Sequence, residues 1–296
     1  MEVIFLGTAA MQPTKKRSHS AILVRHDYEN ILVDCGEGTQ RQMIIMGLKP
    51  TKITRILISH WHGDHVIGLA GLINNLGANQ YNGILEIYGP KGIDMYFKNI
   101  TNSCIFQEKI KTKLIELKEG LVFENNRLKV EAFKLKHSCP CFGFNFLEKD
   151  KRKINVEYLK KLGLGTHPLL GELQRGKDII WKDKKIKVEK ATKLVPGKKL
   201  SILLDTGYST DYIKKLKGAD VLISEGTLLS DLKSKADLFK HLTVKDAASI
   251  AKKANVKKLV ITHISQRYKD SSEVLKEAKS IFSNSVCAED FMTLVV

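Results

Sequence analysis

The sequence predicts an α/β domain in which helices cover layers of β-sheet. Short apolar runs of strand-like composition recur along the 296 residues, and segments with helical spacing separate several of them. Residues 149–198 interrupt this pattern with a basic stretch containing several Gly and Pro residues, so the patterned segments fall into two halves. Two halves of mixed strand and helix around one excursion are typical of a layered α/β domain.

Both halves contain helices and strands whose ends are indicated by Gly, Pro and capping residues. A helix is predicted over 39–46, since Gly47 and Pro50 stop it, and further helices over 66–76 and 93–100. In the second half, helices are predicted over 244–253 and over 271–282, the latter capped by Ser271 or Ser272. Strands are predicted at 3–6, 20–24, 31–33, 56–58, 85–88, 112–117, 121–124, 128–135 and 142–147, and then at 201–204, 221–224, 259–262 and 291–296.

The composition favours a cytoplasmic globular protein. With 43% hydrophobic residues the chain can bury a full core, and no apolar run reaches the roughly 18 residues of a membrane span. The N-terminus begins with a strand-like run and no basic leader, so we expect no signal peptide. The five cysteines are scattered and odd in number, which predicts free thiols in a reducing compartment and no disulfide partner.

The charge balance points to a polyanionic partner. Lys and Arg number 49 against 32 Asp and Glu, a formal net charge of +17, and nucleic acid is the first candidate. A lysine-rich, merely solvated surface is the alternative. Residues 149–198 contain 15 basic and 6 acidic residues, which is more than half of the net charge. Because this excess is localised, it favours a binding surface.

The stretch HWHGDH at 60–65 gathers metal-binding side chains at the end of an apolar strand. Imidazole and carboxylate together suit zinc and similar metals. Side chains at His60 and His62 can turn toward one point, and those at Asp64 and His65 toward a second point nearby. Two metals need more ligands than this loop holds, so the others must come from distant parts of the chain.

Three such residues stand just after apolar runs elsewhere. His137 follows the strand at 128–135, Asp205 follows 201–204, and His263 follows 259–262. A lone histidine at a strand end is usually structural, but three such positions together with the cluster predict a dinuclear metal site.

Several motifs of this sequence resemble those of a known family. HWHGDH resembles the H-x-H-x-D-H signature of the metallo-β-lactamase superfamily, and the wider set of motifs is similar to ribonuclease Z, the tRNA 3′-processing endonucleases. The resemblance implies a four-layer αββα sandwich over 1–296 as one domain, with 149–198 as an inserted flexible arm that binds tRNA. The motifs are FLGTAAMQPTKKRSHS (5–20), VDCGEGTQRQM (33–43), SHWHGDHVIGLAGL (59–72), KHSCPCFGF (136–144), LLDTG (203–207), HLT (241–243), THISQRY (262–268) and AEDFM (288–292).

The resemblance also implies ligands and catalytic roles. It assigns two Zn²⁺ per subunit, with other divalent metals possible. Asp64 would also hold the attacking water, and Asp34 would orient a ligand from outside the coordination sphere. The implied ligands are His60, His62 and His137 for one metal, Asp64, His65 and His263 for the other, and Asp205 as the bridge between them.

The implied reaction removes the 3′ trailer from precursor tRNA. A hydroxide formed between the metals attacks phosphorus. His241, paired with Glu225, then protonates the departing 3′-oxygen, leaving a tRNA 3′-hydroxyl and a trailer with a 5′-phosphate. On spacing alone, His241 reads as a surface histidine; the resemblance reverses this.

The resemblance further implies a homodimer whose arm grips tRNA phosphates. In the arm, His167-Pro168 stands where the family has Gly-Pro. Phosphate contact stays equally open with helix capping or a surface salt bridge for Thr39, Gln40, Arg41, Arg267 and Tyr268. His19, Cys139 and Cys141 lie outside the ligand set. The candidates for substrate binding are Lys151, Arg152, Lys153, Arg175, Lys177 and Arg267.

Two other functions compete with the endonuclease. One is another hydrolase on the same scaffold, such as a small phosphodiesterase, a thioesterase or an arylsulfatase-like enzyme; a small substrate needs no basic arm and no His241–Glu225 pair. The other is a non-catalytic RNA-binding module, which the complete ligand set disfavours. Fold alone does not decide among them.

Overall fold

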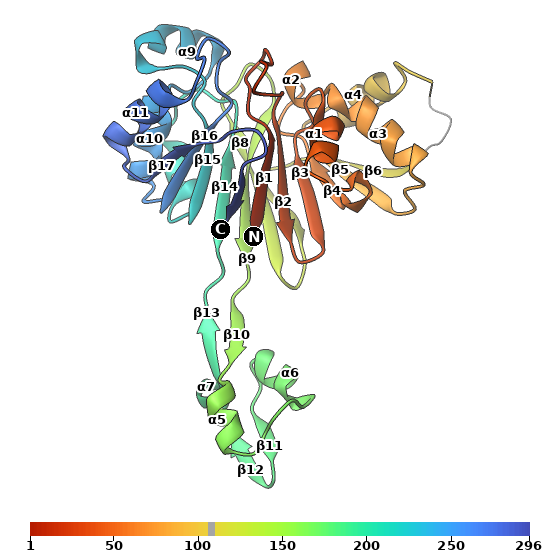
Figure 1. The fold of residues 1–296 in the computed structure, drawn as a ribbon, viewed down its shortest axis with the longest axis vertical. Coiled ribbons are helices and arrows are strands. Elements are labelled where there is room, and N and C mark those ends of the chain that lie inside the picture. Colours follow the sequence, from red (N-terminus) through yellow and green to blue (C-terminus); the bar gives the residue numbers. More distant parts are fainter. Residues whose placement is uncertain (106–109) are drawn as a thin grey trace.

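The computed structural model describes residues 1–105 and 110–296, which form two seven-stranded sheets packed face to face. Helices cover the outer face of each sheet, as Figure 1 shows. The predicted four-layer αββα sandwich is therefore confirmed. Figure 1 also shows a long projection at one end of the sandwich, formed by the segment between β9 (Cys141–Glu148) and β14 (Lys199–Leu203).

The first sheet has the order β18-β1-β2-β3-β4-β5-β6. β3, β4, β5 and β6 are parallel to one another, whereas β1 pairs antiparallel with β2 and with the C-terminal β18. Its strands are β1 (Glu2–Gly7), β2 (Ala21–His26), β3 (Glu29–Val33), β4 (Arg55–Leu57), β5 (Ile84–Gly89), β6 (Lys111–Glu116) and β18 (Thr293–Val295).

The second sheet has the order β17-β16-β15-β14-β9-β8-β7. β14 to β17 run parallel, and β14 pairs antiparallel with β9. β17 was not predicted, because its three residues are too few for a period-two pattern. The remaining strands are β7 (Gly120–Glu124), β8 (Leu128–Leu135), β15 (Val221–Glu225), β16 (Lys258–Thr262) and β17 (Ser285–Cys287).

The helix predicted over 66–76 is in fact two helices. α2 (Gly63–Val66) and α3 (Gly68–Ala78) meet at Gly68, where an added Cβ would lie 2.0 Å from the carbonyl oxygen of Gly36. Asp64 and His65 lie on α2, whereas the sequence analysis predicted that the whole histidine cluster lies in a loop. The other helices on this side are α1 (Thr39–Ile45), the 3₁₀ turn η1 (Pro50–Lys52) and α4 (Ile93–Thr101).

On the second sheet, α10 (Val244–Lys253) has the predicted bounds. Thr243 and Asp246 form a reciprocal capping box that fixes its start. α11 (Ser272–Ile281) also agrees with the prediction, although Ser271 makes no side-chain cap bond. α8 (Asp211–Leu216), η2 (Ser230–Leu232) and α9 (Lys233–Phe239) were missed, because helices this short depend on tertiary contacts.

The central core lies between the two sheets. Phe5 from the first sheet and Phe144 and Phe146 from the second are fully buried there. Gly143 faces the other side of its sheet, where an added Cβ would lie 2.5 Å from the Phe133 ring. Close packing on both faces makes the sandwich a rigid support for the loops at its ends.

Residues 149–198 form the projection in Figure 1, called the arm below. β10 (Lys151–Ile154) pairs antiparallel with β13 (Thr192–Val195) and makes its stem. A small apolar cluster that includes Leu159, Leu173 and Ile186 fills the distal part, so the arm has a core of its own. The distal elements are α5 (Val156–Lys161), α6 (Leu169–Gln174), β11 (Ile179–Trp181), β12 (Lys184–Ile186) and α7 (Val188–Ala191).

The structure also bears on membrane-spanning helices and on the cysteines. None of the helices in the described part of the chain combines the length and the hydropathy that crossing a bilayer requires. All five cysteines are free thiols, and Cys35 and Cys141 are buried.

Candidate metal centre

The predicted ligands meet at one end of the sandwich because they follow strands that end there. β3 and β4 are parallel neighbours in one sheet, and β14, β15 and β16 are parallel neighbours in the other. Side chains just past the carboxyl ends of parallel strands converge on a common edge. Asp34 follows β3, His60 follows β4, Asp205 follows β14, and His263 follows β16.

The first ligand group consists of His60, His62, His137 and Asp205, whose potential ligand atoms all lie within 4.8 Å of one another. His62 Nδ1 lies 3.2 Å from His137 Nε2. His60 Nε2 is 3.7 Å and His137 Nε2 is 4.0 Å from Asp205 Oδ2. Three nitrogens and one oxygen thus face a common point.

The second group consists of Asp64, His65 and His263. Asp64 Oδ2 lies 3.5 Å from His65 Nε2 and 3.4 Å from His263 Nε2. Those same two nitrogens are 3.5 Å and 3.3 Å from Asp205 Oδ1. The two oxygens of Asp205 therefore face different groups, which is the arrangement of a bridging carboxylate.

These residues fit a pair of divalent ions. Ligand atoms bound at zinc's usual bond length in a tetrahedron are about 3.3–3.4 Å apart, close to the separations observed here. His60 Nε2 and Asp205 Oδ1 are buried, and neither has a hydrogen-bond partner in the described structure. Buried polar atoms without partners are costly, and bound cations would satisfy both.

Each ligand histidine is held through the ring nitrogen that faces away from its group. Such contacts fix the ring orientation and select which nitrogen stays free for a metal. The partners are Ser59 Oγ for His60 Nδ1 (3.0 Å), Ser138 Oγ for His62 Nε2 (3.3 Å), Asp34 Oδ2 for His65 Nδ1 (2.6 Å), the Lys240 carbonyl for His137 Nδ1 (3.0 Å) and Thr227 Oγ1 for His263 Nδ1 (3.0 Å).

Asp34 links the two ligand groups. Its carboxylate accepts hydrogen bonds from the main-chain N–H and the hydroxyl of Ser59, both at 2.7 Å, as well as contacting His65. Its φ of 59° lies in the left-handed region, as do those of Lys240 and His263, both 54°. Three strained non-glycine residues beside one site indicate that the surrounding structure holds them in place for function.

The electrostatics keep the two central carboxylates ionised. Burial alone would raise the pKa of Asp205, but His263 and His65 outweigh it and hold the value well below the usual range. For Asp64, hydrogen bonds from His263 and His65 likewise overcome burial and lower the pKa. Anionic oxygens in a nest of imidazoles are ready metal ligands.

His241 and Glu225 form a pair beside the ligands. His241 Nδ1 lies 3.0 Å from Glu225 Oε2, and Glu225 is fully buried. Glu225 Oε1 accepts the main-chain N–H of Thr206 at 2.6 Å. Burial opposes the imidazolium form, but the Glu225 carboxylate outweighs it and raises the pKa of His241 to about 9. The Glu225 carboxylate therefore favours the protonated form of this imidazole.

Five of the six predicted substrate-binding residues lie on the arm, and only Arg267 lies near this cluster in the sequence. Lys151, Arg152 and Lys153 are on the arm stem, where Arg152 donates to the hydroxyl of Thr192. Arg175 and Lys177 both pair with Glu172, so part of the arm's charge is already matched. Arg267 is exposed near His263, and its Nε donates to Ser265 Oγ at 3.2 Å.

For two of the residues whose role stayed open, the side chains make internal contacts. Thr39 donates to the carbonyl of Gly36, and the Tyr268 hydroxyl accepts the N–H of Leu229. His19 Nε2 contacts the Met11 carbonyl at 3.0 Å. Cys139 Sγ lies 3.8 Å from His62 Nε2.

Sequence reasoning did not find several contributors. Ser59, Ser138, Thr227 and the Lys240 carbonyl all support ligand histidines. Ser59 and Ser138 are sequence neighbours of His60 and His137, which is a usable signal. Thr227 and Lys240 carry none, since a hydroxyl or a carbonyl has no distinctive pattern.

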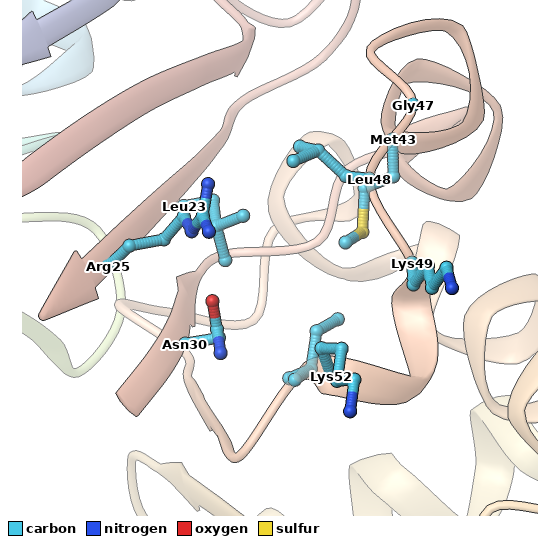
Figure 2. Close-up of a pocket in the computed structure, with 9 residues that line it drawn as sticks. Leu23, Arg25, Asn30, Met43, Gly47, Leu48, Lys49 and Lys52 are labelled. Atoms are coloured by element: carbon cyan, nitrogen blue, oxygen red, sulfur yellow. The ribbon is translucent and has the colours of Figure 1, made fainter. Parts of the chain in front are cut away.

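A separate pocket of about 280 Å³ lies beside α1 and η1, and Figure 2 shows Lys49 and Lys52 on one side of it and Arg25 on the other. Its lining contains no carboxylate, imidazole or thiol. It is lined by Leu23, Arg25, Asn30, Met43, Gly47, Leu48, Lys49, Lys52 and Ile53.

Comparisons with known proteins find relatives in both sequence and structure. Residues 14–131 match the metallo-beta-lactamase superfamily model. Over its full length the chain is 37% identical to a protein named ribonuclease Z from Methanothermobacter thermautotrophicus, covering 97% of that protein. It is also 37% identical to a ribonuclease BN from Escherichia coli, with 98% of each chain covered. The crystal structure of the short form of human tRNase Z superposes with a TM-score of 0.70 at 31% identity, covering 100% of this chain and 99% of that one.

Proposed function

The chain belongs to the ribonuclease Z family, the tRNA 3′-processing endonucleases of the metallo-β-lactamase fold, and on this premise we propose that it uses two Zn²⁺ ions to remove the 3′ trailer from precursor tRNA. The products are a tRNA with a free 3′-hydroxyl and a trailer with a 5′-phosphate. The observation that carries the proposal is the orientation of the Asp205 carboxylate, whose two oxygens face two separate groups of ligand atoms.

In this proposal His60, His62 and His137 hold one ion, and Asp64, His65 and His263 hold the other, with Asp205 shared. When bound, two divalent ions supply positive charge beside the scissile phosphate and lower the pKa of a nearby water. Asp64 also positions that water. Asp34 and Ser59 fix His65 and His60, so the metal-binding nitrogens are already oriented before substrate arrives.

His241 acts as the general acid. The departing 3′-oxygen must take up a proton, and His241 carries one at neutral pH because Glu225 raises its pKa to about 9. Its ring lies close to those of His137 and His263, with centroids 5.3 Å and 5.7 Å away, so the proton is held beside the ligands. A small-molecule hydrolase that releases a good leaving group has less need of this pair.

The arm provides the contact with the body of tRNA. It joins the sandwich at the end of β9 and the start of β14, whereas Asp205 follows the other end of β14, and Figure 1 shows the arm projecting from one end of the sandwich. A tRNA gripped by the arm is therefore directed away from the arm's own site, which supports a homodimer in which the arm serves the partner's site. Lys151, Lys153 and Arg152 are the first candidates for phosphate contact.

The test is cleavage of a 3′-extended precursor tRNA by purified protein, with and without added zinc, beside an Asp64→Ala variant. An exposed carboxylate in the first turn of α4 gives the matched control, Asp94→Ala. We expect zinc-dependent release of the intact trailer by wild type and by the control, and none by Asp64→Ala. Hydrolysis of a small phosphodiester without cleavage of the precursor would leave the metal site standing and overturn the substrate.

A further inference from the structure

We propose that Thr227 is a positioning residue that couples metal binding at His263 to the orientation of the His241–Glu225 pair. The part of this inference that concerns catalysis rests on the function proposed above, whereas the part that concerns metal binding does not. Thr227 was not among the predicted site residues, and it lies two positions after the end of β15.

The hydroxyl of Thr227 lies between two functional groups. Oγ1 is 2.6 Å from Glu225 Oε2 and 3.0 Å from His263 Nδ1. It is also 2.9 Å from the carbonyl oxygen of His263. Thr227 is 7% exposed, and Glu225 and His263 are more deeply buried still. No water is needed to complete this set of contacts, because each group is within direct hydrogen-bond distance.

The valence of the hydroxyl determines the direction of these bonds. His263 presents Nε2 to Asp64 and Asp205, so a metal held there leaves the ring hydrogen on Nδ1. Nδ1–H then donates to Thr227 Oγ1, which has a single hydrogen left to give. Of its two acceptors the Glu225 carboxylate is both closer and charged, so it takes that hydrogen.

The chain of donors therefore runs from His263 through Thr227 to Glu225. At Oε2 the carboxylate accepts from both Thr227 and His241, and at Oε1 from the Thr206 N–H. Glu225 is thus held from three sides, with its charge directed at His241. Without a metal on Nε2, the hydrogen of His263 can move to that nitrogen, and Thr227 can then donate to Nδ1 instead of to Glu225.

A second contact of the same kind reaches His241 from the other metal group. His137 Nδ1 contacts the carbonyl of Lys240, the residue directly before His241, at 3.0 Å. The backbone next to His241 is thus hydrogen-bonded to His137, and Glu225 is linked to His263 through Thr227. Of these two contacts, only the one through Thr227 can be removed by substituting a side chain that is not itself a proposed ligand.

The experiment compares Thr227→Val, which keeps the shape and removes the hydroxyl, with Thr227→Ser, which keeps it. Thr54→Val is the matched control, since the Thr54 hydroxyl also donates to a buried glutamate, Glu29 Oε2, at 2.8 Å. This pair lies in the other sheet, where Glu29 begins β3 and Thr54 precedes β4, at the end away from the ligands. Zinc affinity is measured by competition with a chromophoric chelator. kcat and KM for precursor tRNA are then measured at saturating zinc.

We expect Thr227→Val to bind zinc about 10- to 100-fold more weakly, the usual effect of removing a ligand's outer partner. At saturating zinc its kcat falls by about tenfold with KM unchanged, because the acid pair is misplaced while tRNA binding is intact. Thr227→Ser restores both quantities, and Thr54→Val changes neither.

Three results would overturn the proposal or part of it. Wild-type zinc affinity and kcat in Thr227→Val refute it entirely. Weaker zinc binding with wild-type kcat at saturation refutes the link to Glu225. A Thr227→Ser variant as defective as Thr227→Val shows that the methyl group and packing matter rather than the hydroxyl. If the wild-type protein fails to cleave precursor tRNA, the proposed function is wrong, and zinc competition by itself then decides whether Thr227 supports His263.

Discussion

Replacing Glu225 by glutamine should produce a loss of activity that depends strongly on pH. The substitution keeps the shape of the side chain but removes its charge. The amide oxygen can still accept the Thr206 N–H that Oε1 accepts at 2.6 Å. The amide nitrogen then faces His241 Nδ1 and donates to it, which favours the neutral imidazole over the charged one.

The magnitude follows from the His241 pKa. Glu225 raises it from 6.5 to about 9 against the effect of burial. At pH 7.5 an imidazole with a pKa of 9 is about 97% protonated, whereas one with a pKa of 6.5 is about 9% protonated. Burial and the amide N–H both keep the pKa of the variant at or below 6.5, so loss of the carboxylate lowers the rate of a step that needs imidazolium by at least about tenfold at pH 7.5. Bound cations lower the pKa of His241 in the wild type and in the Glu225→Gln variant alike, so the test compares the rates of the two proteins.

The sign of the pH dependence is specific. The raised pKa keeps the acid charged up to higher pH in wild type, so the advantage of Glu225 is largest on the alkaline side. At pH 6 both imidazoles are mostly protonated, and the two rates should approach each other. His241→Gln lacks the acid altogether and should be slow at every pH.

The assay is single-turnover cleavage of 3′-extended precursor tRNA between pH 5.5 and 9 with zinc in excess. The ratio of the wild-type to the Glu225→Gln rate should rise from about 1 at pH 5.5 to about 10 at pH 7.5, and to about 150 at pH 9. A ratio that stays constant with pH would refute the assignment of Glu225 to the protonation of His241, and it would leave Glu225 a structural role only.

The other predictions concern the metal, the arm and the core. Asp34→Ala should weaken zinc binding by about 10- to 100-fold in chelator competition, since His65 loses its partner; wild-type affinity would contradict this. Lys151→Glu with Lys153→Glu should raise KM for precursor tRNA and flatten its salt dependence, while hydrolysis of a small phosphodiester stays unchanged; an equal loss on both substrates would point to misfolding instead. Gly143→Ala should lower the free energy of unfolding by about 1–3 kcal/mol in urea titration, because its Cβ would meet the Phe133 ring at 2.5 Å; full stability would show that the ring can move aside.

Local signals in the sequence were enough for the long elements. α10 was predicted with both bounds because its apolar spacing is regular, and the structure adds the capping box of Thr243 and Asp246 at its start. β8 was predicted with both bounds because apolar residues recur along all eight of its positions. α8 and α9 were missed; helices of six or seven residues take most of their stability from tertiary contacts, and α1, equally short, was predicted only from the stop signals Gly47 and Pro50.

The arm illustrates the same limit. Its Gly and Pro residues and its excess of Lys marked it as an excursion, but nothing local revealed the stem of β10 and β13, whose pairing joins residues about forty positions apart. The interior of the distal part was likewise hidden, because its apolar residues are spread thinly among lysines.

By itself the sequence determined the residue types of the metal centre and the layered α/β architecture, because HWHGDH and the polar residues after apolar strands are local signals. The sequence and its resemblance also assigned these residues to two groups. Only the tertiary structure decided the distances within each group and the orientation of the two Asp205 oxygens, which depend on the packing of one sheet against the other. It alone also selected Thr227, Ser59 and the Lys240 carbonyl as partners of the ligand histidines. A hydroxyl or a carbonyl acquires such a role from position alone, and position is set by contacts between distant parts of the chain.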